Sequence, residues 1–352
     1  MHAFAIYDDD HSVTDIELPT PTPTGAEVLL RVLHSGVCHT DTHLREGHYD
    51  LGSRGRLNLV DRGVTYPLVL GHEVVGVVEA VGPEAKGVVV GDHRLVYPWI
   101  GEGDCDACRA GEENLCAAPK NLGVARHGGY ADRILVPHSR YLLDVAGLDE
   151  RWAATLACSG LTAYSAARKA LPAEPRDPVV VIGAGGVGLM AIASLRALGH
   201  EVIVAVDLQE RNLELARELG ATVTVSAAEV DLQTAILDQT GGPVSAVVDF
   251  VNNSATAPVA FGILRKGGTM IQVGLFGGEF TIPTALLTLK ILSIRGSFVG
   301  SLGELAELVR LAQQGALPSI PIIDEQLTAA AVEASLNRLA AGGVPGRIVL
   351  TA

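Results

Sequence analysis

The first part of the chain, up to about residue 150, alternates short runs of apolar and polar residues with turns rich in glycine and proline. Runs at 27–35, 72–81 and 130–136 have the period of two that is typical of β-strands. Several short strands separated by such turns predict an all-β domain with long loops.

The middle of the chain, from about residue 155 to 296, has a different pattern, in which apolar runs alternate with stretches of helical periodicity. The apolar runs begin at or lie near Val179, Val202, Val223, Ala246, Gly268 and Leu292. This alternation predicts an α/β domain built on a doubly wound parallel sheet.

The last part of the chain is expected to return to the first domain. Helical periodicity over 302–314 is followed by a final apolar strand over 346–350. We therefore assign 1–155 and 297–352 to one domain and 156–296 to the other. Two domains also agree with the length of 352 residues, which exceeds the ~250–300 at which a single core usually stops growing.

Composition indicates a soluble globular protein, with 48% hydrophobic and 19% charged residues. The net charge of −14 argues against unaided binding to nucleic acids or anionic membranes. The uncharged stretch 179–195 approaches the ~18 residues of a membrane span, but its glycines favour a strand, a turn and a helix. Because no signal peptide is recognised, we expect a cytoplasmic protein that binds small molecules and no membrane.

Five cysteines fall into two groups, which predict two zinc ions per chain. Cys105, Cys108 and Cys116 share one short loop, whereas Cys38 and Cys158 stand far apart in the segments GVCHTD and LACSG. Neither the odd number of cysteines nor the lack of a signal peptide supports disulfides, so we interpret the thiols as metal ligands.

The loop 101–116 has the spacing of a structural zinc site in which one cysteine is missing. Such sites are almost always closed by four ligands in a tetrahedron, and the three cysteines supply only three. Glu102 precedes Cys105 by the same step that separates Cys105 from Cys108, so we predict that its carboxylate is the fourth ligand. The alternative is that Glu102 is a surface acid in an acidic loop.

Cys38 and Cys158 indicate a zinc site of the catalytic kind, in which three protein ligands leave a fourth position for water or substrate. His72 is the best-placed third ligand, because it stands beside Glu73 in an apolar segment where polar groups need a partner. Glu73 is a candidate neighbouring group or transient ligand, and Asp41 a candidate acceptor for a hydrogen bond from the imidazole. The alternative for His72 is an ordinary core histidine.

A glycine-rich turn follows the first apolar run of the middle domain. Gly183, Gly185 and Gly188 form the pattern GxGxxG between a buried strand and a helix whose N-terminus can hold a pyrophosphate. Gly186 and Val187 belong to the same turn and are candidates for cofactor contact. Alone, this pattern is a weak signal.

The next apolar strand strengthens the signal. It covers 201–206 and ends in Asp207, about 20 residues past the glycines, where an acid would bind the ribose hydroxyls of a dinucleotide. An acid at this position repels a 2′-phosphate, so we expect NAD in preference to NADP. Because Arg211 follows shortly after Asp207, NADP remains an alternative cofactor.

Several segments, in this order and spacing, resemble the zinc-dependent medium-chain alcohol dehydrogenases: GVCHTD, GHE, GEGDCDACRAGEENLC, ACSGLTAY and GAGGVG. The resemblance covers essentially the whole chain and is strongest to the Sulfolobus-type NAD-dependent enzymes, which likewise have Glu in place of the first cysteine of the loop. It implies a GroES-like all-β catalytic domain, a Rossmann NAD-binding domain, and reversible hydride transfer between primary or secondary alcohols and NAD. It also implies a homodimer or homotetramer, assembled through 292–298.

The resemblance further implies roles for single residues. Thr40 would hydrogen-bond the alcohol hydroxyl and pass its proton to His43, while Glu73 could approach the zinc ion held by Cys38, His72 and Cys158. Contacts to the cofactor would come from His39 and Arg347 at the pyrophosphate and from the backbones of Val273, Ser297 and Val299 at the carboxamide. Trp99 and Leu122 would line the substrate pocket.

Each of these roles has a plainer alternative. Trp99 could serve in core packing alone, His39 and His43 could lie in a solvated loop, and Arg347 could form a surface ion pair. For the whole chain the alternatives are a polyol or sugar dehydrogenase, which would commonly have a carboxylate in place of Cys158, and a zinc- and NAD-binding protein without turnover. The apolar residues near Trp99, 121–122 and 275–276 favour a hydrophobic alcohol.

Overall fold

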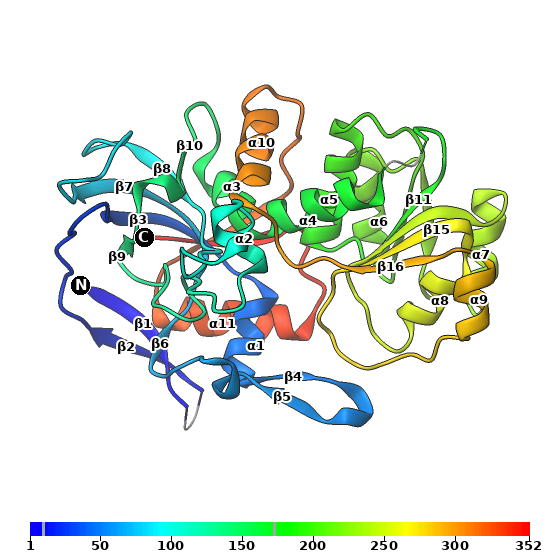
Figure 1. The fold of residues 1–352 in the computed structure, drawn as a ribbon, viewed down its shortest axis with the longest axis horizontal. Coiled ribbons are helices and arrows are strands. Elements are labelled where there is room, and N and C mark those ends of the chain that lie inside the picture. Colours follow the sequence, from blue (N-terminus) through cyan, green and yellow to red (C-terminus); the bar gives the residue numbers. More distant parts are fainter. Residues whose placement is uncertain (9–10, 172–173) are drawn as a thin grey trace.

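The computed structural model describes residues 1–8, 11–171 and 174–352 of the chain. Figure 1 shows two lobes, one made from the beginning and the end of the chain and the other from its middle. The last strands of the chain, β17 (Ile322–Gln326) and β18 (Arg347–Thr351), thus lie in the same lobe as its beginning.

The first lobe is built on two sheets. A three-stranded sheet has the order β2-β1-β6, with β1 at His2–Ile6, β2 at Val13–Glu17 and β6 at Leu68–Val69. The larger sheet has the order β10-β8-β7-β3-β18-β17, and β9 also pairs with β3. Its strands are β3 (Val28–Gly36), β7 (Glu73–Val81), β8 (His93–Val96), β9 (Arg133–Val136), β10 (Leu142–Asp144), β17 (Ile322–Gln326) and β18 (Arg347–Thr351).

The C-terminal strand β18 lies inside this larger sheet. It pairs antiparallel with β3 and parallel with β17. The strands predicted at 27–35, 72–81 and 346–350 thus correspond to β3, β7 and β18 within a residue or two, whereas the run at 130–136 is shorter and forms β9.

Helices and a hairpin complete the first lobe. Helix α1 (His39–Glu46) packs against α11 (Ala329–Ala341), and a hairpin of β4 (His48–Asp50) and β5 (Arg56–Asn58) extends from the lobe. The zinc-loop region contains the short helices α2 (Asp106–Arg109) and η3 (Glu113–Leu115). Three further short helices are η1 (Gly52–Arg54), η2 (Val60–Arg62) and η4 (Ser139–Tyr141).

The second lobe contains a six-stranded, all-parallel sheet of order β13-β12-β11-β14-β15-β16, which is the predicted doubly wound topology. The strands are β11 (Val179–Ile182), β12 (Ile203–Asp207), β13 (Val223–Ser226), β14 (Val244–Asp249), β15 (Leu264–Gln272) and β16 (Ser293–Gly296). Successive residues of β11 pack into two different cores, Val179 and Val181 in one and Val180 and Ile182 in the other. Both faces of the sheet are therefore covered.

Helices α5 (Gly186–Ala197), α6 (Glu210–Glu218), α7 (Leu232–Thr240), α8 (Thr256–Gly262) and α9 (Thr284–Leu289) connect these strands. The apolar stretch 179–195 is divided between β11 and α5, as its glycines predict. Within the described ranges, no helix combines the length and the apolar character needed to cross a bilayer.

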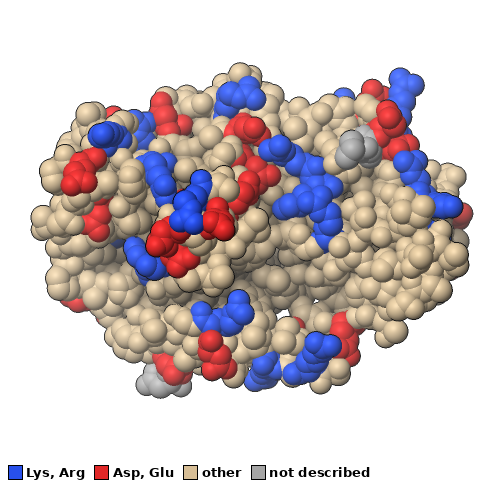
Figure 2. All heavy atoms as spheres, in the orientation of Figure 1, with Lys and Arg blue, Asp and Glu red and all other residues tan. Residues whose placement is uncertain are grey.

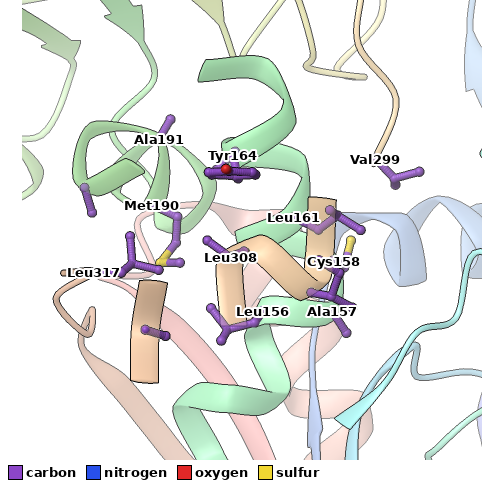
Figure 3. Close-up of a cluster of buried hydrophobic side chains, with 14 of the residues drawn as sticks. Leu156, Ala157, Cys158, Leu161, Tyr164, Met190, Ala191, Val299, Leu308 and Leu317 are labelled. Atoms are coloured by element: carbon purple, nitrogen blue, oxygen red, sulfur yellow. The ribbon is translucent and has the colours of Figure 1, made fainter. Parts of the chain in front are cut away.

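One continuous helical segment joins the lobes. It consists of α3 (Glu150–Thr155), a π-turn at Leu156–Gly160 and α4 (Leu161–Ala170). Figure 3 shows Leu156, Leu161 and Tyr164 from this segment beside Met190 and Leu308, so α4, α5 and α10 (Leu302–Gln313) pack together. The domain boundary that we predict at 155–156 falls inside this helical segment.

Candidate metal and cofactor sites

Cys38, His72 and Cys158 are brought together from three elements, and all three side chains are buried. Cys38 is the N-cap of α1, His72 directly precedes β7, and Cys158 lies in the π-turn before α4. The two sulfur atoms are 3.8 Å apart, and one ligand atom from each residue lies within 4.8 Å of the others. This spacing suits three vertices of a zinc tetrahedron with bond lengths of about 2.0–2.3 Å.

The chemistry of His72 fits a metal as well as its position does. The residue is 1% exposed, yet neither ring nitrogen makes a hydrogen bond in the described structure. A buried polar group without a partner is costly, so a ligand for one of these nitrogens is expected.

Asp41 lies behind this histidine. Its Oδ1 is 3.2 Å from His72 Nδ1, and its Oδ2 accepts hydrogen bonds from the Cys38 amide and the Tyr130 hydroxyl at 2.9 and 3.0 Å. Burial lowers the pKa of His72, but the Asp41 carboxylate and Cys38 outweigh burial and raise that pKa overall. A carboxylate in this position can fix the orientation of a metal-ligating imidazole.

Glu73 is fully buried and has two partners. Its Oε2 accepts a hydrogen bond from Arg347 at 2.5 Å, and its Oε1 accepts one from the amide of Ser159 at 2.8 Å. Burial raises the pKa of Glu73, although the guanidinium opposes this shift. Glu73 is therefore held next to the predicted zinc ligands by Arg347, and it is not one of the three clustered groups.

The zinc loop brings together three of its four predicted ligands. Cys105 Sγ lies 3.4 Å from Cys108 Sγ and 3.8 Å from Cys116 Sγ. Glu102 is exposed and its carboxylate is not part of this cluster, whereas its backbone amide donates to Cys116 Sγ at 3.4 Å. Its role as fourth ligand stays a prediction.

Glu113 is a second acid in this loop, which the sequence analysis did not single out. It is 4% exposed and accepts hydrogen bonds from the Gly101 amide, the Tyr141 hydroxyl and Arg140 at 3.1, 2.9 and 2.8 Å. These bonds fasten the loop to the body of the lobe. No local pattern distinguishes this acid from its exposed neighbours, because its partners are distant in sequence.

The glycine turn has the shape of a dinucleotide site. Gly183 follows β11 with φ +88°, a conformation that favours glycine, and a side chain at Gly188 would collide with the carbonyl of Gly183. A Cβ at Gly185 would meet no atom within 4 Å, so this position faces open space at the N-terminus of α5. An anion such as a pyrophosphate can approach the free amides there, and Val187 lies in the same first turn.

Asp207 ends β12 beside this turn, as predicted. Its Oδ2 accepts a hydrogen bond from the Ala184 amide at 2.7 Å, and its Oδ1 accepts bonds from the Gln209 amide and the Asn212 side chain at 2.9 and 3.1 Å. The half-buried carboxylate thus orders the glycine turn and keeps lone pairs for ribose hydroxyls.

Arg347 connects the glycine turn with the predicted zinc ligands. It is 4% exposed, and a Cβ at Gly186 would lie 2.5 Å from its Cδ. Its Nε has no hydrogen-bond partner among the described residues, which leaves one donor for a cofactor phosphate. The alternative of a surface ion pair is wrong, because the pair with Glu73 is buried.

His39, Thr40 and His43 lie in the first turns of α1 and are half-buried. The ring of His39 is 5.2 Å from that of Phe276 in the other lobe, and the ring of His43 is 4.8 Å from that of Tyr49. Burial lowers the pKa of both histidines. The alternative of a solvated loop is therefore wrong for both.

Trp99 is 1% exposed, with its ring centroid 5.2 Å from that of His72 and 5.6 Å from that of Phe298. Its indole N–H donates to the Ala157 carbonyl at 3.0 Å, and Leu122 is buried nearby in the same core. Trp99 thus packs in the core beside the predicted ligand His72, and its predicted role as a wall of the substrate pocket stays a prediction.

Two cavities lie between the lobes and share residues of the second lobe. Their volumes are about 900 and 890 Å³, and both are lined by Asn252, Gln272, Gly274, Leu275 and Phe298. Val273 and Ser297 line the first cavity, Asn121 lines the second, and the buried Trp99 and Leu122 line neither. Phe298 is half exposed and was missed as a pocket residue, because only the fold places it between the cavities.

The molecular surface carries both signs of charge. Figure 2 shows acidic and basic side chains interspersed over the visible face, with no basic patch that extends across it. The net charge is −14, so the acids dominate over the whole chain.

Comparisons with known proteins match both lobes. The sequence model of the GroES-like domain of alcohol dehydrogenases matches residues 24–146, and that of the zinc-binding dehydrogenases matches 186–314. NAD-dependent alcohol dehydrogenases of Sulfurisphaera tokodaii and Saccharolobus solfataricus are 38% and 37% identical over 95% of each chain. The crystal structure of the Aeropyrum pernix alcohol dehydrogenase has a TM-score of 0.89 at 31% identity, with both chains fully covered. The D-arabinose dehydrogenase from Sulfolobus solfataricus has a TM-score of 0.83 at 30% identity, again over both full chains.

Proposed function

This chain belongs to the zinc-binding alcohol dehydrogenase family, and from that membership we propose that Cys38, His72 and Cys158 form its catalytic centre. The activity is reversible, NAD-dependent hydride transfer that interconverts a primary or secondary alcohol and an aldehyde or ketone. The buried His72 ring is the observation that carries this assignment. Its Nδ1 lies 3.2 Å from Asp41 Oδ1, its Nε2 has no hydrogen-bond partner in the described structure, and the thiols of Cys38 and Cys158 complete the cluster.

Zinc at these ligands would supply Lewis acidity that eases removal of the alcohol proton. The chain supplies the route for that proton: Thr40 accepts the hydrogen bond of the alcohol hydroxyl, and His43 passes the proton toward solvent. Both side chains are half-buried on α1, directly after Cys38. Cys105, Cys108 and Cys116 would hold a second zinc ion, with Glu102 as the proposed fourth ligand.

NAD would occupy the C-terminal edge of the parallel sheet. The free amides of the first turn of α5 and the unpaired Nε of Arg347 would bind its pyrophosphate, together with His39. Asp207 would accept hydrogen bonds from the adenosine ribose, and the backbones of Val273, Ser297 and Val299 would hold the carboxamide. With the proposed domain boundaries 1–155, 156–296 and 297–352, this cofactor would lie between the lobes.

Apolar side chains in the second cavity support a hydrophobic alcohol as substrate. Tyr49, Leu57, Leu59, Phe280 and Phe298 line a space of about 890 Å³, much more than a short aliphatic alcohol fills. Asp61 and Arg62 line the same cavity, and a D-arabinose dehydrogenase has the same fold. A sugar alcohol is therefore the second candidate substrate.

The proposal also covers the assembly of the protein and its compartment. Strand β16 is an open edge of the parallel sheet, with Ile291 and Phe298 exposed beside it, which supports a homodimer or homotetramer that pairs these edges. Five free cysteines fit a reducing, cytoplasmic compartment.

The deciding experiment measures NADH formation with a panel of aliphatic, benzylic and polyhydroxylated alcohols, using NAD and NADP in parallel. We expect the highest kcat/KM with NAD and an apolar alcohol. Preference for polyols would establish the second candidate. Absence of turnover with every alcohol, in protein shown to contain zinc, would refute the proposed function.

A further inference from the structure

Lys169 is a cation in an unusual position near the end of α4. Its ammonium group donates hydrogen bonds to Ser165 Oγ at 2.9 Å and to Ser297 Oγ at 2.8 Å. No carboxylate forms an ion pair with it in the described structure, and burial lowers its pKa. Arg168, the residue before it, shows the contrast, because it pairs with Glu307 at 2.9 Å.

Hydrogen-bond chemistry fixes what Ser297 can do. An ammonium group has three donors and no acceptor, so Ser297 Oγ must act as the acceptor toward Lys169. The hydroxyl hydrogen of Ser297 therefore remains available to another acceptor. Ser297 lines the first cavity together with Val273 and Gly274. A hydrogen-bond acceptor that binds in this cavity can therefore lie next to the Ser297 hydroxyl.

The segment that carries Ser297 is held at both ends. The Ser297 amide donates to the Gln272 carbonyl at 2.9 Å, and the Gly300 carbonyl accepts a hydrogen bond from Tyr97 OH at 2.9 Å. Between them Val299 has φ +42°, which is unfavourable for a β-branched residue and persists only where its surroundings hold it. Lys169 adds a charged contact to this segment through its hydrogen bond to Ser297.

We propose that Lys169 is a positioning residue for the nicotinamide end of the cofactor. It holds the Ser297 hydroxyl as a donor toward a carbonyl acceptor, such as the carboxamide oxygen of NADH. Helix α4 lies where the two lobes meet, and its preceding π-turn carries Cys158, so one helical segment contacts both the zinc ligands and the nicotinamide site. This inference builds on the proposed function, which places Ser297 beside the carboxamide.

The charge of Lys169 adds a second effect. The nicotinamide ring is positively charged in NAD and neutral in NADH, so a nearby ammonium group favours the reduced cofactor. Removal of the charge should therefore weaken NADH binding more than NAD binding. ADP-ribose contains the pyrophosphate and both riboses but no nicotinamide, and its affinity should not depend on Lys169.

The test measures dissociation constants of NADH, NAD and ADP-ribose for the zinc-loaded parent and for Lys169→Met, Lys169→Arg and Ser297→Ala. We expect Lys169→Met to weaken NADH by about tenfold, because the Ser297 hydroxyl is no longer held as a donor and the favourable charge is lost, and to change ADP-ribose less than twofold. Lys169→Arg should recover part of the loss. Because the two residues act together, Lys169→Met combined with Ser297→Ala should be no weaker than the worse single variant.

Equal weakening of NADH and ADP-ribose would show that Lys169 only supports the fold, and unchanged NADH binding would also overturn the proposal. Ser297→Ala keeps the test decisive if Lys169→Met does not fold, because it removes the hydroxyl donor that Lys169 is proposed to position. A parent that binds NADH but oxidises no alcohol would refute the proposed function and leave this inference open to the same binding test. A parent that binds no NADH would overturn both.

Discussion

Arg347 forms a buried ion pair with Glu73 at 2.5 Å, and the aliphatic part of its side chain packs on Gly186. The carboxylate directly follows the predicted zinc ligand His72, while the glycine opens α5 in the other lobe. One side chain therefore connects the metal centre with the dinucleotide turn.

Replacement of Arg347 by Met should damage both sites. A buried carboxylate that loses its partner costs about 3–5 kcal/mol, so the free energy of unfolding should fall by that order. The affinity for NAD should fall as well, because the unpaired Nε is lost. Urea unfolding and NAD titration measure the two effects. Arg176→Met is the control, since Arg176 forms an exposed pair with Glu201 and should cost about 0–1 kcal/mol; equal losses in the two variants would contradict the connecting role.

The two cysteine clusters predict two zinc ions with separable functions. Cys38→Ala should abolish activity and retain one zinc ion in a folded protein, because the loop cluster is intact. Cys105→Ala should instead lose the loop zinc and melt at a lower temperature while some activity remains. Elemental analysis and melting curves provide the measurement, and a single zinc ion in the parent would refute the two-site interpretation.

Asp207 should determine the preference for NAD, but its hydrogen bond from Ala184 complicates a simple deletion. Asp207→Gly would lose the ribose contact and also loosen the turn. Asp207→Asn keeps one acceptor oxygen, which can serve Ala184, and it removes the charge and the second acceptor oxygen. We expect Asp207→Asn to reduce the NAD:NADP ratio of kcat/KM by about tenfold, from ~1.5 kcal/mol in one charged hydrogen bond. A parent that already prefers NADP would contradict the role of this acid.

Glu102 offers a sharp test because its exposed carboxylate lies apart from the three thiols. If it closes the site when zinc binds, Glu102→Ala should lose the loop zinc under mild chelation and melt at a lower temperature, with kcat/KM nearly intact. Glu102→Cys should retain the metal more firmly, since a thiolate is a softer donor. Asp104→Ala, a change of another exposed acid in the loop, is the control; an alanine variant at 102 that matches it would make Glu102 a surface acid.

The proton relay predicts a dependence on pH. Burial lowers the pKa of His43, so the neutral imidazole that can accept a proton is present above that lowered pKa and is lost as the pH falls through it. Thr40→Ala should depress kcat at every pH, and Thr40→Ser should restore it. His43→Ala should matter most at low pH, where added buffer base should rescue part of the rate. Full activity of Thr40→Ala would remove the relay.

Much of the fold and the metal chemistry is predictable from local patterns. Apolar periodicity locates β3, β7 and the parallel strands. The positions of the cysteines identify five of the six residues that the structure brings together in two clusters, and the sixth, His72, is recognised as a polar residue in an apolar segment. Helix α1 escapes prediction, because HTDTHLRE has little apolar periodicity. It begins where Cys38 and Asp41 form a capping box, an arrangement that the tertiary fold supports.

The remaining site residues depend on contacts between distant parts of the chain. Lys169 meets Ser297 across 128 positions and Arg347 meets Glu73 across 274, so neither partner can be recognised from its neighbours in sequence. Phe298 and Glu113 are similar cases. Their neighbours in sequence do not indicate that Phe298 is half exposed and Glu113 buried, because only the fold determines this.

The position of β18 has a consequence for how the protein is made. This strand is the neighbour of β3, yet the ribosome synthesises it only after the entire second lobe. Until then β3 lacks one of its neighbours and Glu73 lacks its arginine. The second lobe, whose six strands are contiguous in sequence, can fold first as a unit during translation. The nascent first lobe therefore has an open sheet edge until β18 is synthesised. A chaperone that covers this edge would have its greatest effect during that interval.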